Sequence, residues 1–432
     1  MFEELDITSP KRNKEHQAGW DGFFPYYAGY PDAFVRSILK SSGLPAGSMV
    51  ADPWNGSGTT TYAASTLGYA SRGIDLNPVM AVVALARLLA PSEADSLEPL
   101  ATKLVKRLRV ETKRLAEDDP LLLWFARPAA SAIRAIERRI RDQLVGALTR
   151  TATGTRLDRM SCLAATFYVA LFTACRTLAA EFQCSNPTWT RRPKVDEEKL
   201  EVSREAVICG FLLNIRAMAA ALADRQARYS IERVGAEILV ADTTSQCWTP
   251  NSIDIVITSP PYCTRIDYTA ATRIELALLQ GLLQIEFKEL GRSMIGSTRV
   301  PLSNLEVSET WGPLCARFLE NVKTHRSKAS SGYYYKTHLD YFEKMSRSFS
   351  NMSCALKARA PAILVVQDSY YKDIHNDLPS ILEEMAASHG LGLRRRRDFR
   401  LSRSMAGINP HTKTYGRKAG ALEAVLCFEK IA

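Results

Sequence analysis

Two short segments of this chain combine residue types that suit ligand binding and catalysis. The first is the segment 52–60, DPWNGSGTT, in which two glycines follow an apolar run. Glycine lets a backbone approach a ligand closely, because a Cβ at that position would collide with the ligand. The glycines are not followed by GK[ST], and the chain contains no GxGxxG. The pattern therefore predicts neither a phosphate-binding P-loop nor a dinucleotide fingerprint.

An acidic residue stands at the end of the next predicted strand. Asp75 lies in the segment 73–78, GIDLNP. A carboxylate at the tip of such a strand can accept hydrogen bonds from both ribose hydroxyls of an adenosine. The glycine turn and this acid together predict a site for an adenosine-containing ligand.

The second segment is 253–262, IDIVITSPPY, where an apolar strand runs directly into Ser259-Pro260-Pro261-Tyr262. A rigid turn at the end of a strand would explain the two prolines, but not the hydroxyl and the aromatic ring beside them. Proline removes backbone donors and stiffens the chain, which leaves carbonyl oxygens available as acceptors. Such acceptors suit an amino group whose two hydrogens must be held.

The surrounding pattern predicts the elements that would position these turns. The segment 48–89 alternates strand, glycine turn, helix, strand and helix, which is typical of a parallel sheet with crossover helices. From 92 to about 229 the apolar residues recur at helical spacing. Further strands are predicted at 237–241, 253–258, 362–367, 393–401 and 424–429, with a helix at 378–388.

Composition narrows the class of protein. Hydrophobic residues make up 46% and charged residues 24% of the 432 positions, which favours a globular chain over a disordered one. We see no apolar run of the length that a membrane span needs and no secretory signal, and therefore expect a cytoplasmic protein. Nine cysteines without a CxxC pair fit a reducing compartment, and neither they nor the six histidines show metal-ligand spacing.

Three basic segments are candidates for contacts with nucleic-acid phosphates. Nine of the basic residues that give the chain its net charge of +10 lie between Arg394 and Lys418, against one acid. The other two segments are Arg191–Lys194 and Lys323–Lys336. For each segment, a solvated surface is an equally good interpretation.

The glycine and SPPY motifs together resemble those of the amino-group DNA methyltransferases of prokaryotic modification systems. The family's glycine motif is similar to Asp52–Gly58, with Trp54 where phenylalanine is usual. Its catalytic motif, (Asp/Asn/Ser)-Pro-Pro-(Tyr/Phe), matches Ser259–Tyr262. The version Thr-Ser-Pro-Pro-Tyr looks like the cytosine-N4 branch, whereas Asp or Asn at the first position is typical of adenine-N6 enzymes.

The resemblance implies a class I α/β fold: a doubly wound, mostly parallel seven-stranded sheet with a largely helical insertion. It implies S-adenosylmethionine as the cofactor and DNA as the partner. The expected regions are 1–91, the N-terminal cofactor-binding part of the catalytic domain; 92–230, a helical insertion suited to target recognition; and 231–432, the catalytic part with the C-terminal strands.

The resemblance also implies roles for single residues. Phe24 and Tyr27 resemble a segment that packs against the methionine end of the cofactor, and Asp242 follows a strand where the family places a residue near the adenine. The expected catalytic residues are Ser259, Pro260, Pro261 and Tyr262, without a metal. The expected cofactor-binding residues are Asp52, Trp54, Asn55, Gly56, Gly58, Thr59, Asp75, Asn77, Asp242, Phe24 and Tyr27.

The implied mechanism must activate a weak nucleophile. The exocyclic base nitrogen reacts poorly because its lone pair is delocalised into the ring. The Ser259 hydroxyl and the Pro260 carbonyl would accept the amino hydrogens and favour a localised lone pair. Tyr262 would stack on the base, which must first be flipped out of the duplex. A cognate restriction or defence-system partner is compatible with the resemblance, and the oligomeric state is left open.

Three alternatives stay open, and a fourth is disfavoured. Methylation of adenine N6 is the nearest alternative, because the prediction of cytosine N4 depends on one residue, the serine at the first position of the catalytic motif. A structured RNA is another possible substrate, and a DNA-binding protein on a retired methyltransferase fold is an alternative of a different class. Cys263 follows Tyr262 and suggests a cysteine nucleophile, but carbon-5 methylation places its cysteine after a proline in a different motif.

Overall fold

The structure is a computed structural model. It describes residues 2–12, 19–25, 29–145, 150–151, 154–155, 157–184, 190–226, 234–245, 248–264, 267–283, 286–299, 305–400 and 422–431.

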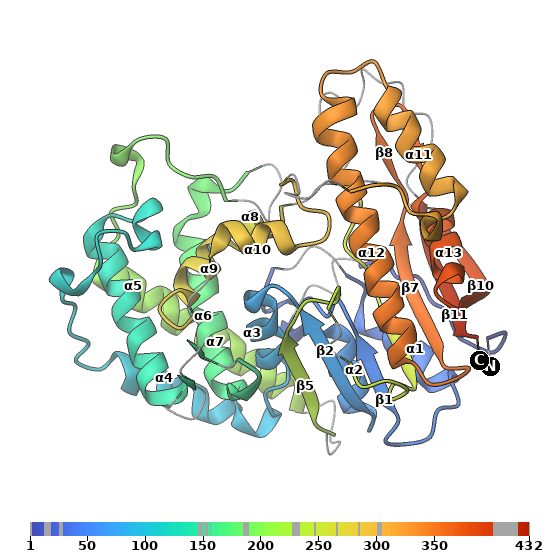
Figure 1. Ribbon diagram of the computed structural model, residues 1–432. Coiled ribbons are helices and arrows are strands. Elements are labelled where there is room, and N and C mark those ends of the chain that lie inside the picture. Colours follow the sequence, from blue (N-terminus) through green and yellow to red (C-terminus); the bar gives the residue numbers. More distant parts are fainter. Residues whose placement is uncertain are drawn as a thin grey trace.

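A seven-stranded sheet forms the centre of the molecule (Figure 1). Five neighbouring strands run parallel, and the strand β11 is antiparallel to both of its neighbours. This topology confirms the expected doubly wound, mostly parallel sheet. In spatial order the strands are β10 (Leu391–Arg400), β11 (Leu422–Lys430), β7 (Pro361–Gln367), β6 (Ile255–Thr258), β1 (Met49–Asp52), β2 (Ala70–Asp75) and β5 (Ala236–Val240).

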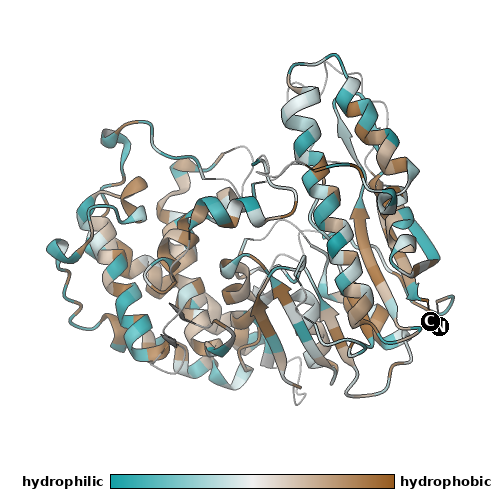
Figure 2. Ribbon diagram, in the orientation of Figure 1, coloured by the Kyte–Doolittle hydropathy of each residue, from teal (hydrophilic) through white to brown (hydrophobic). Residues whose placement is uncertain are grey.

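Alternate residues of each central strand enter different hydrophobic clusters, because successive side chains point to opposite faces of a sheet. Val50 and Ile257 pack with the helices α1 (Asp32–Ser41) and α2 (Thr59–Thr66). Ala51 and Val256 pack in the cluster of α11 (Pro313–Thr324), α12 (Tyr335–Ala355) and α13 (Leu378–Ser388). The strand β7 is hydrophobic along most of its length, as expected for a strand covered on both faces (Figure 2).

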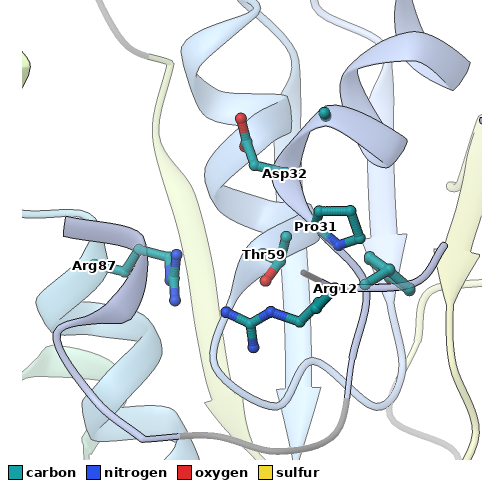
Figure 3. A pocket seen from close by; sticks show the side chains of 7 residues that line it. Arg12, Pro31, Asp32, Thr59 and Arg87 are labelled. Atoms are coloured by element: carbon teal, nitrogen blue, oxygen red, sulfur yellow. The ribbon is translucent and has the colours of Figure 1, made fainter. Parts of the chain in front are cut away.

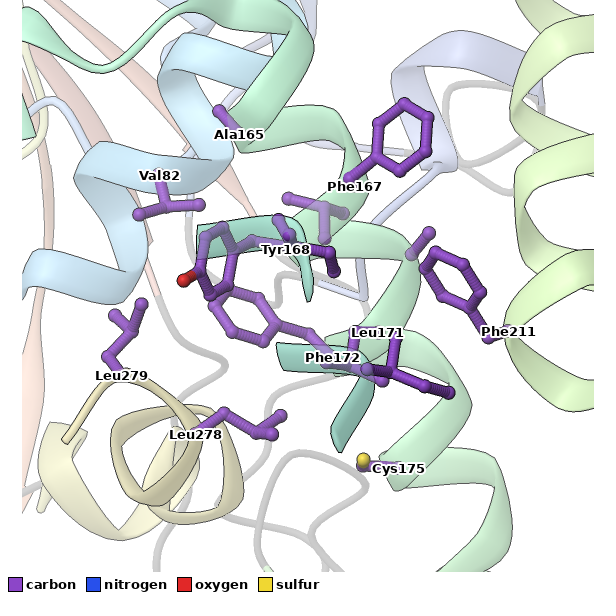
Figure 4. Packing of buried hydrophobic residues seen from close by; sticks show 14 of the residues in the cluster. Val82, Ala165, Phe167, Tyr168, Leu171, Phe172, Cys175, Phe211, Leu278 and Leu279 are labelled. Atoms are coloured by element: carbon purple, nitrogen blue, oxygen red, sulfur yellow. The ribbon is translucent and has the colours of Figure 1, made fainter. Parts of the chain in front are cut away.

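A largely helical insertion lies between β2 and β5, as the fold class predicts. After α3 (Pro78–Arg87), which returns to the sheet, the insertion contains α4 (Ala94–Val105), α5 (Arg127–Ile140), α6 (Cys162–Leu178), α7 (Arg204–Gln226) and the short strands β3 (Arg150–Thr151) and β4 (Gly154–Thr155). Phe167 and Phe172 of α6 are fully buried. Figure 4 shows α6 packed between Val82 of α3, Phe211 of α7 and Leu278 of the later segment 268–279. The insertion therefore shares one hydrophobic core with helices of the sheet domain.

Three short helices follow the SPPY turn: α8 (Tyr268–Ala271), α9 (Arg273–Leu279) and α10 (Phe287–Ser293). Arg134 of α5 donates to the carbonyls of Ala277 and Leu278 at 2.9 and 2.8 Å. Arg176 of α6 forms an ion pair with the fully buried Glu275. Side chains of the insertion thus hold α9 in place.

The hairpin of β8 (Ser369–Tyr371) and β9 (Ile374–Asn376) extends the chain beyond β7. The sequence pattern did not predict it, because strands of three residues are too short to show a period of two. It packs with α11 in the upper right of Figure 1.

Within the described residues, α7 is the one helix long and apolar enough to cross a membrane by length and composition. The sequence reading, which found no such run, missed it. Val207, Phe211 and Ile215 follow helical spacing and are fully buried. They belong to the hydrophobic core of the insertion, and α7 packs against α4 and α6.

Candidate functional site

The glycine turn and the SPPY turn lie side by side at one edge of the sheet. Their strands β1 and β6 are parallel neighbours, with Val50 paired to Ile255. The carboxyl ends of neighbouring parallel strands meet at the same edge, where open α/β sheets bind their ligands. The Thr258 hydroxyl donates directly to Asp52 Oδ1 at 2.5 Å. This hydrogen bond joins the ends of the two strands.

Asp52 is buried at this junction, with 3% of its surface exposed. Besides the Thr258 bond, it accepts hydrogen bonds from the Trp54 backbone N–H at 3.1 Å and from the Tyr30 hydroxyl at 3.2 Å. Burial raises the pKa of Asp52 to about 6, against the opposing effect of its hydrogen-bond donors. Its side chain holds the two turns together and is not presented to solvent.

The glycine turn needs its glycines for steric reasons. Gly56 and Gly58 have φ values of 49° and 80°, in the left-handed region that favours glycine. A Cβ on Gly58 would lie 2.8 Å from the Cβ of Ala84 in α3. The turn therefore brings the start of α2 directly against α3.

We expect Gly58→Ala to destabilise the protein by about 2 to 4 kcal/mol, because positive-φ strain and the collision with Ala84 add. Gly68→Ala is a matched control: Gly68 has φ of 85° and nothing within 4 Å of an added Cβ. Urea unfolding of both variants separates the collision from the backbone strain. Equal losses of stability would show that α3 gives way without cost.

Asp75 ends β2 next to the glycine turn and is partly exposed. Its carboxylate accepts from the backbone N–H of Gly56 at 2.9 Å and of Asn77 at 2.8 Å. Burial raises the pKa of Asp75 to about 6, and the nearby charge of Asp52 adds to the rise. A carboxylate has about four lone-pair sites, so two remain for ribose hydroxyls.

This pKa shift predicts a pH-dependent effect of Asp75→Asn on stability. The ordinary value is 3.8, so between about pH 4 and about pH 6 the folded state holds a proton that the unfolded state has released. The carboxyl therefore lowers the free energy of unfolding as pH rises through this range, and asparagine does not. The stability of the variant relative to wild type should increase up to about pH 6 and then level off. Urea unfolding across this range would contradict the assignment if the difference stayed constant.

The side chains of Asn55 and Asn77 point inward. Asn55 is 4% exposed, accepts from the Thr61 hydroxyl at 3.2 Å, and occupies the space that a Cβ on Gly73 would fill. Asn77 caps α3 by accepting from the Val79 N–H at 3.1 Å. Both side chains therefore support the turns from within.

The remaining expected cofactor residues differ in position. Asp242 follows β5 at the same edge, since Val240 pairs with Asp75. Trp54 is partly exposed, and its buried indole Nε1 has no hydrogen-bond partner among the described residues. Phe24 is buried in the core of the insertion, beneath the guanidinium of Arg176. Tyr27 lies outside the described residues.

A cavity of about 130 Å³ opens beside the start of α2. Figure 3 shows Thr59 facing the guanidinium of Arg12, with Asp32 above them and Arg87 to the left. The lining therefore offers positive, negative and hydroxyl groups within one small space. Such a lining fits the carboxylate and ammonium of an amino acid, and sequence reasoning found Thr59 but missed Arg12.

Backbone and side-chain hydrogen bonds fix the SPPY turn from three directions. The Ser259 hydroxyl donates to the carbonyl of Val365 in β7 at 3.0 Å. The Tyr341 hydroxyl donates to the Pro261 carbonyl at 2.9 Å, and the Tyr262 N–H donates to the Tyr268 hydroxyl at 3.1 Å. Among the described residues, no group donates to the Pro260 carbonyl.

Three residues that sequence reasoning missed hold the site together. Tyr268 and Tyr341 bind the SPPY turn, and the Thr272 hydroxyl accepts from Asn77 at 2.9 Å. Burial of Tyr268 raises its pKa, so its hydroxyl stays protonated. None of the three belongs to a motif, and the contact between Tyr341 and Pro261 spans 80 positions.

Cys263 is buried beside the turn, and burial raises the pKa of its thiol to about 12. A thiol with that pKa stays protonated at neutral pH, whereas the nucleophile is the thiolate. The environment of Cys263 thus disfavours a cysteine attack on the ring.

The structure assigns intramolecular partners to the basic residues of β10. Arg395 donates to the carbonyls of Phe2 and Leu5, each at 2.9 Å, and Arg397 to that of Ile7 at 2.6 Å. Arg394 pairs with Glu429. Arg395 and Arg397 thus fasten the N-terminal segment to the sheet edge, a structural role that the sequence pattern did not predict. The rest of the segment, 401–418, lies outside the described residues.

Comparison with known proteins agrees with this geometry. Residues 3–84 match the family model for N6 and N4 DNA methylases. The Type II methyltransferase M.BsoBI of Geobacillus stearothermophilus is 22% identical over 298 residues, which cover 63% of this chain and 55% of that protein. M.AvaI of Nostoc sp. is 28% identical over 151 residues, 32% of this chain and 31% of that protein. The chain thus spans about half, or less, of the curated relatives it matches.

Among solved structures, the rRNA methyltransferase aviRa from Streptomyces viridochromogenes aligns over 94% of this chain and 87% of its own. The identity is 11% and the TM-score is 0.30. The family model covers the glycine turn and Asp75, and the Type II relatives extend the similarity to a larger part of the chain. These matches support the similarity of the chain to the amino-group DNA methyltransferases.

Proposed function

We propose that this protein transfers a methyl group from S-adenosylmethionine to the exocyclic N4 of cytosine in DNA. One observation carries the proposal. The Ser259 hydroxyl, at the same sheet edge as the glycine turn, donates its own hydrogen to the Val365 carbonyl. Its lone pairs are then the part of the hydroxyl left to meet a substrate, so Ser259 is set to accept a hydrogen from an amino group.

The residues around the glycine turn fit S-adenosylmethionine. Asp75 retains acceptor capacity for the ribose hydroxyls, and Asp242 and Trp54 flank the same edge for the adenine. The cavity at Arg12 and Thr59 suits the amino-acid end. When bound, the cofactor supplies an electrophilic methyl group on a sulfonium.

The residues of the SPPY turn would prepare the nucleophile. Ser259 and the Pro260 carbonyl accept the two amino hydrogens, which favours a lone pair localised on nitrogen and directed at the methyl group. Tyr262 stacks on the base. Positioning of this kind lowers barriers by roughly 7 to 11 kcal/mol in favourable cases. The base must leave the duplex, because the amino group is otherwise paired and out of reach.

The choice of cytosine N4 over adenine N6 rests on Ser259, the residue typical of the N4 branch. The helical insertion, within 92–230, would recognise the target sequence. Its side chains contact α9, and α8, which precedes α9, contacts the SPPY turn through Tyr268. We place the protein in the cytoplasm with its DNA, and its relatives' Type II classification favours a cognate restriction enzyme as partner.

The decisive experiment is incubation of the protein with DNA and methyl-labelled S-adenosylmethionine, followed by digestion to nucleosides. We expect label in N4-methylcytosine. Label in N6-methyladenine would keep the family and overturn the specificity, and label in RNA alone would overturn the substrate class. Saturable cofactor binding without transfer to any nucleic acid would favour a retired enzyme.

A further inference from the structure

Thr272 connects the elements behind the two turns of the site. It lies between α8 and α9, and its side chain is buried, with 6% of the residue exposed. The hydroxyl accepts a hydrogen bond from Asn77 Nδ2 at 2.9 Å and donates one to the backbone carbonyl of Tyr268 at 3.1 Å. A single hydroxyl thus ties the start of α3 to α8.

On one side, Asn77 leads from Thr272 to the glycine turn. The Asn77 side chain caps α3, and its backbone N–H donates to the Asp75 carboxylate at 2.8 Å. The same carboxylate accepts from the Gly56 N–H at 2.9 Å. Asn77 therefore links Thr272 to the carboxylate at which the ribose would bind.

On the other side, Tyr268 leads from Thr272 to the SPPY turn. The carbonyl of Tyr268 accepts from Thr272, and its hydroxyl accepts from the backbone N–H of Tyr262 at 3.1 Å. Proline has no N–H, so Tyr262 carries the one backbone donor in the segment 260–262. A shift of Tyr268 would therefore act on the one amide that can anchor this part of the turn.

The insertion fixes the backbone around Thr272. Arg176 of α6 donates to the carbonyl of Ala271 and forms an ion pair with Glu275, so that it holds the chain just before and just after Thr272. The helix α9 also contacts both α3 and α6. The Thr272 hydroxyl is therefore held in place by the insertion and cannot simply follow either turn.

We propose that Thr272 is a positioning residue for methyl transfer. Acting through Asn77 and Tyr268, its hydroxyl sets the spacing between the cofactor at the glycine turn and the amino group at the SPPY turn. A misplacement of about 1 Å that originates far from the reacting atoms can reduce a rate on the order of a hundredfold. The inference rests on the proposed function, because this spacing matters only if methyl transfer takes place between the two turns.

The test compares Thr272→Val, which removes the hydroxyl and keeps the branched shape, with Thr272→Ser, which keeps the hydroxyl. With S-adenosylmethionine and DNA both saturating, single-turnover transfer by Thr272→Val should fall about tenfold or more. The dissociation constants of both ligands should stay close to wild type, and Thr272→Ser should retain most of the rate. Thr166→Val is the matched control. Thr166 of α6 is buried and also donates to the carbonyl four residues before it, that of Cys162, at 2.8 Å, so its loss should leave the rate unchanged.

Hydrogen exchange followed by mass spectrometry gives a readout that does not depend on activity. In the segment 259–262, only Ser259 and Tyr262 have an amide hydrogen, so exchange at Tyr262 reports on its bond to Tyr268. This exchange should be faster in Thr272→Val than in wild type, and unchanged in Thr166→Val. If Thr272→Val does not fold, Tyr268→Phe takes its place, because it removes the acceptor of the Tyr262 N–H and should cause the same loss of rate.

A merely structural threonine would lower the melting temperature and leave the saturated transfer rate unchanged, and this result would overturn the inference. A lower rate with unchanged exchange at Tyr262 would also overturn it, because the effect would not pass through the SPPY turn. A wild type that transfers no methyl group to any nucleic acid would refute the proposed function. Exchange at Tyr262 would then still decide whether Thr272 positions the SPPY turn.

Discussion

Ser259→Ala is expected to reduce the rate of methyl transfer on the order of a hundredfold or more, because it removes an acceptor that acts on the amino group in the transition state. The affinity for S-adenosylmethionine should stay close to wild type, since Ser259 lies on the turn after β6 and not on the glycine turn. Single-turnover transfer of labelled methyl to DNA, with equilibrium dialysis of the cofactor, measures the two quantities separately.

Ser252→Ala provides a matched control for this variant. Ser252 lies at the opposite end of β6 and also donates its hydroxyl hydrogen to a backbone carbonyl, that of Thr249, at 2.6 Å. Loss of such a bond alone should therefore leave the transfer rate unchanged. Near-normal turnover by Ser259→Ala would remove Ser259 from the mechanism and direct attention to the Pro260 carbonyl.

Asp75→Ala is expected to raise the dissociation constant of S-adenosylmethionine about a hundredfold, because two hydrogen bonds from ribose hydroxyls to a charged acceptor are lost. Isothermal titration of the purified protein measures this change. The variant also leaves the N–H groups of Gly56 and Asn77 without their acceptor. Asp75→Asn, which keeps one acceptor oxygen, should fall between wild type and Asp75→Ala.

The control for a general loss of sheet structure is Asp254→Ala. Asp254 accepts from the Met49 N–H at 2.8 Å at the amino end of β1, so its removal disturbs the strand next to β2 at the sheet edge opposite the glycine turn. Its affinity for S-adenosylmethionine should match wild type. Equal weakening by Asp254→Ala and Asp75→Ala would mean that Asp75 acts through stability and not through the ribose.

Much of the sheet could be predicted from local patterns. Predicted strands at 237–241 and 362–367 correspond to β5 and β7, and the predicted helix 378–388 has the bounds of α13. The shared edge of the two turns also follows from sequence, because each turn ends an apolar strand of one parallel sheet. These features depend on contacts between near neighbours or on strand periodicity.

Long-range contacts explain what the sequence reading missed. Composition shows that Arg395 is charged, but not that its partners are the Phe2 and Leu5 carbonyls at the other end of the chain. The glycine motif likewise suggests that Asn55 faces a ligand, whereas the side chain fills the space left by Gly73. Motif spacing gives the place of a residue on the chain, and the direction of its side chain depends on the packing around it.

The hydrophobic core shared by α6, α3 and α9 has a consequence for engineering new target sequences. Excising the insertion would strip the covering from α3, whose start is capped by Asn77, and would remove Arg134 and Arg176 from α9. An insertion grafted from a relative would therefore have to be accompanied by matching versions of α3 and α9. Under the proposed role of the insertion in target recognition, specificity could therefore not be exchanged as an independent cassette, and redesign is better directed at exposed loops of the insertion than at its helices.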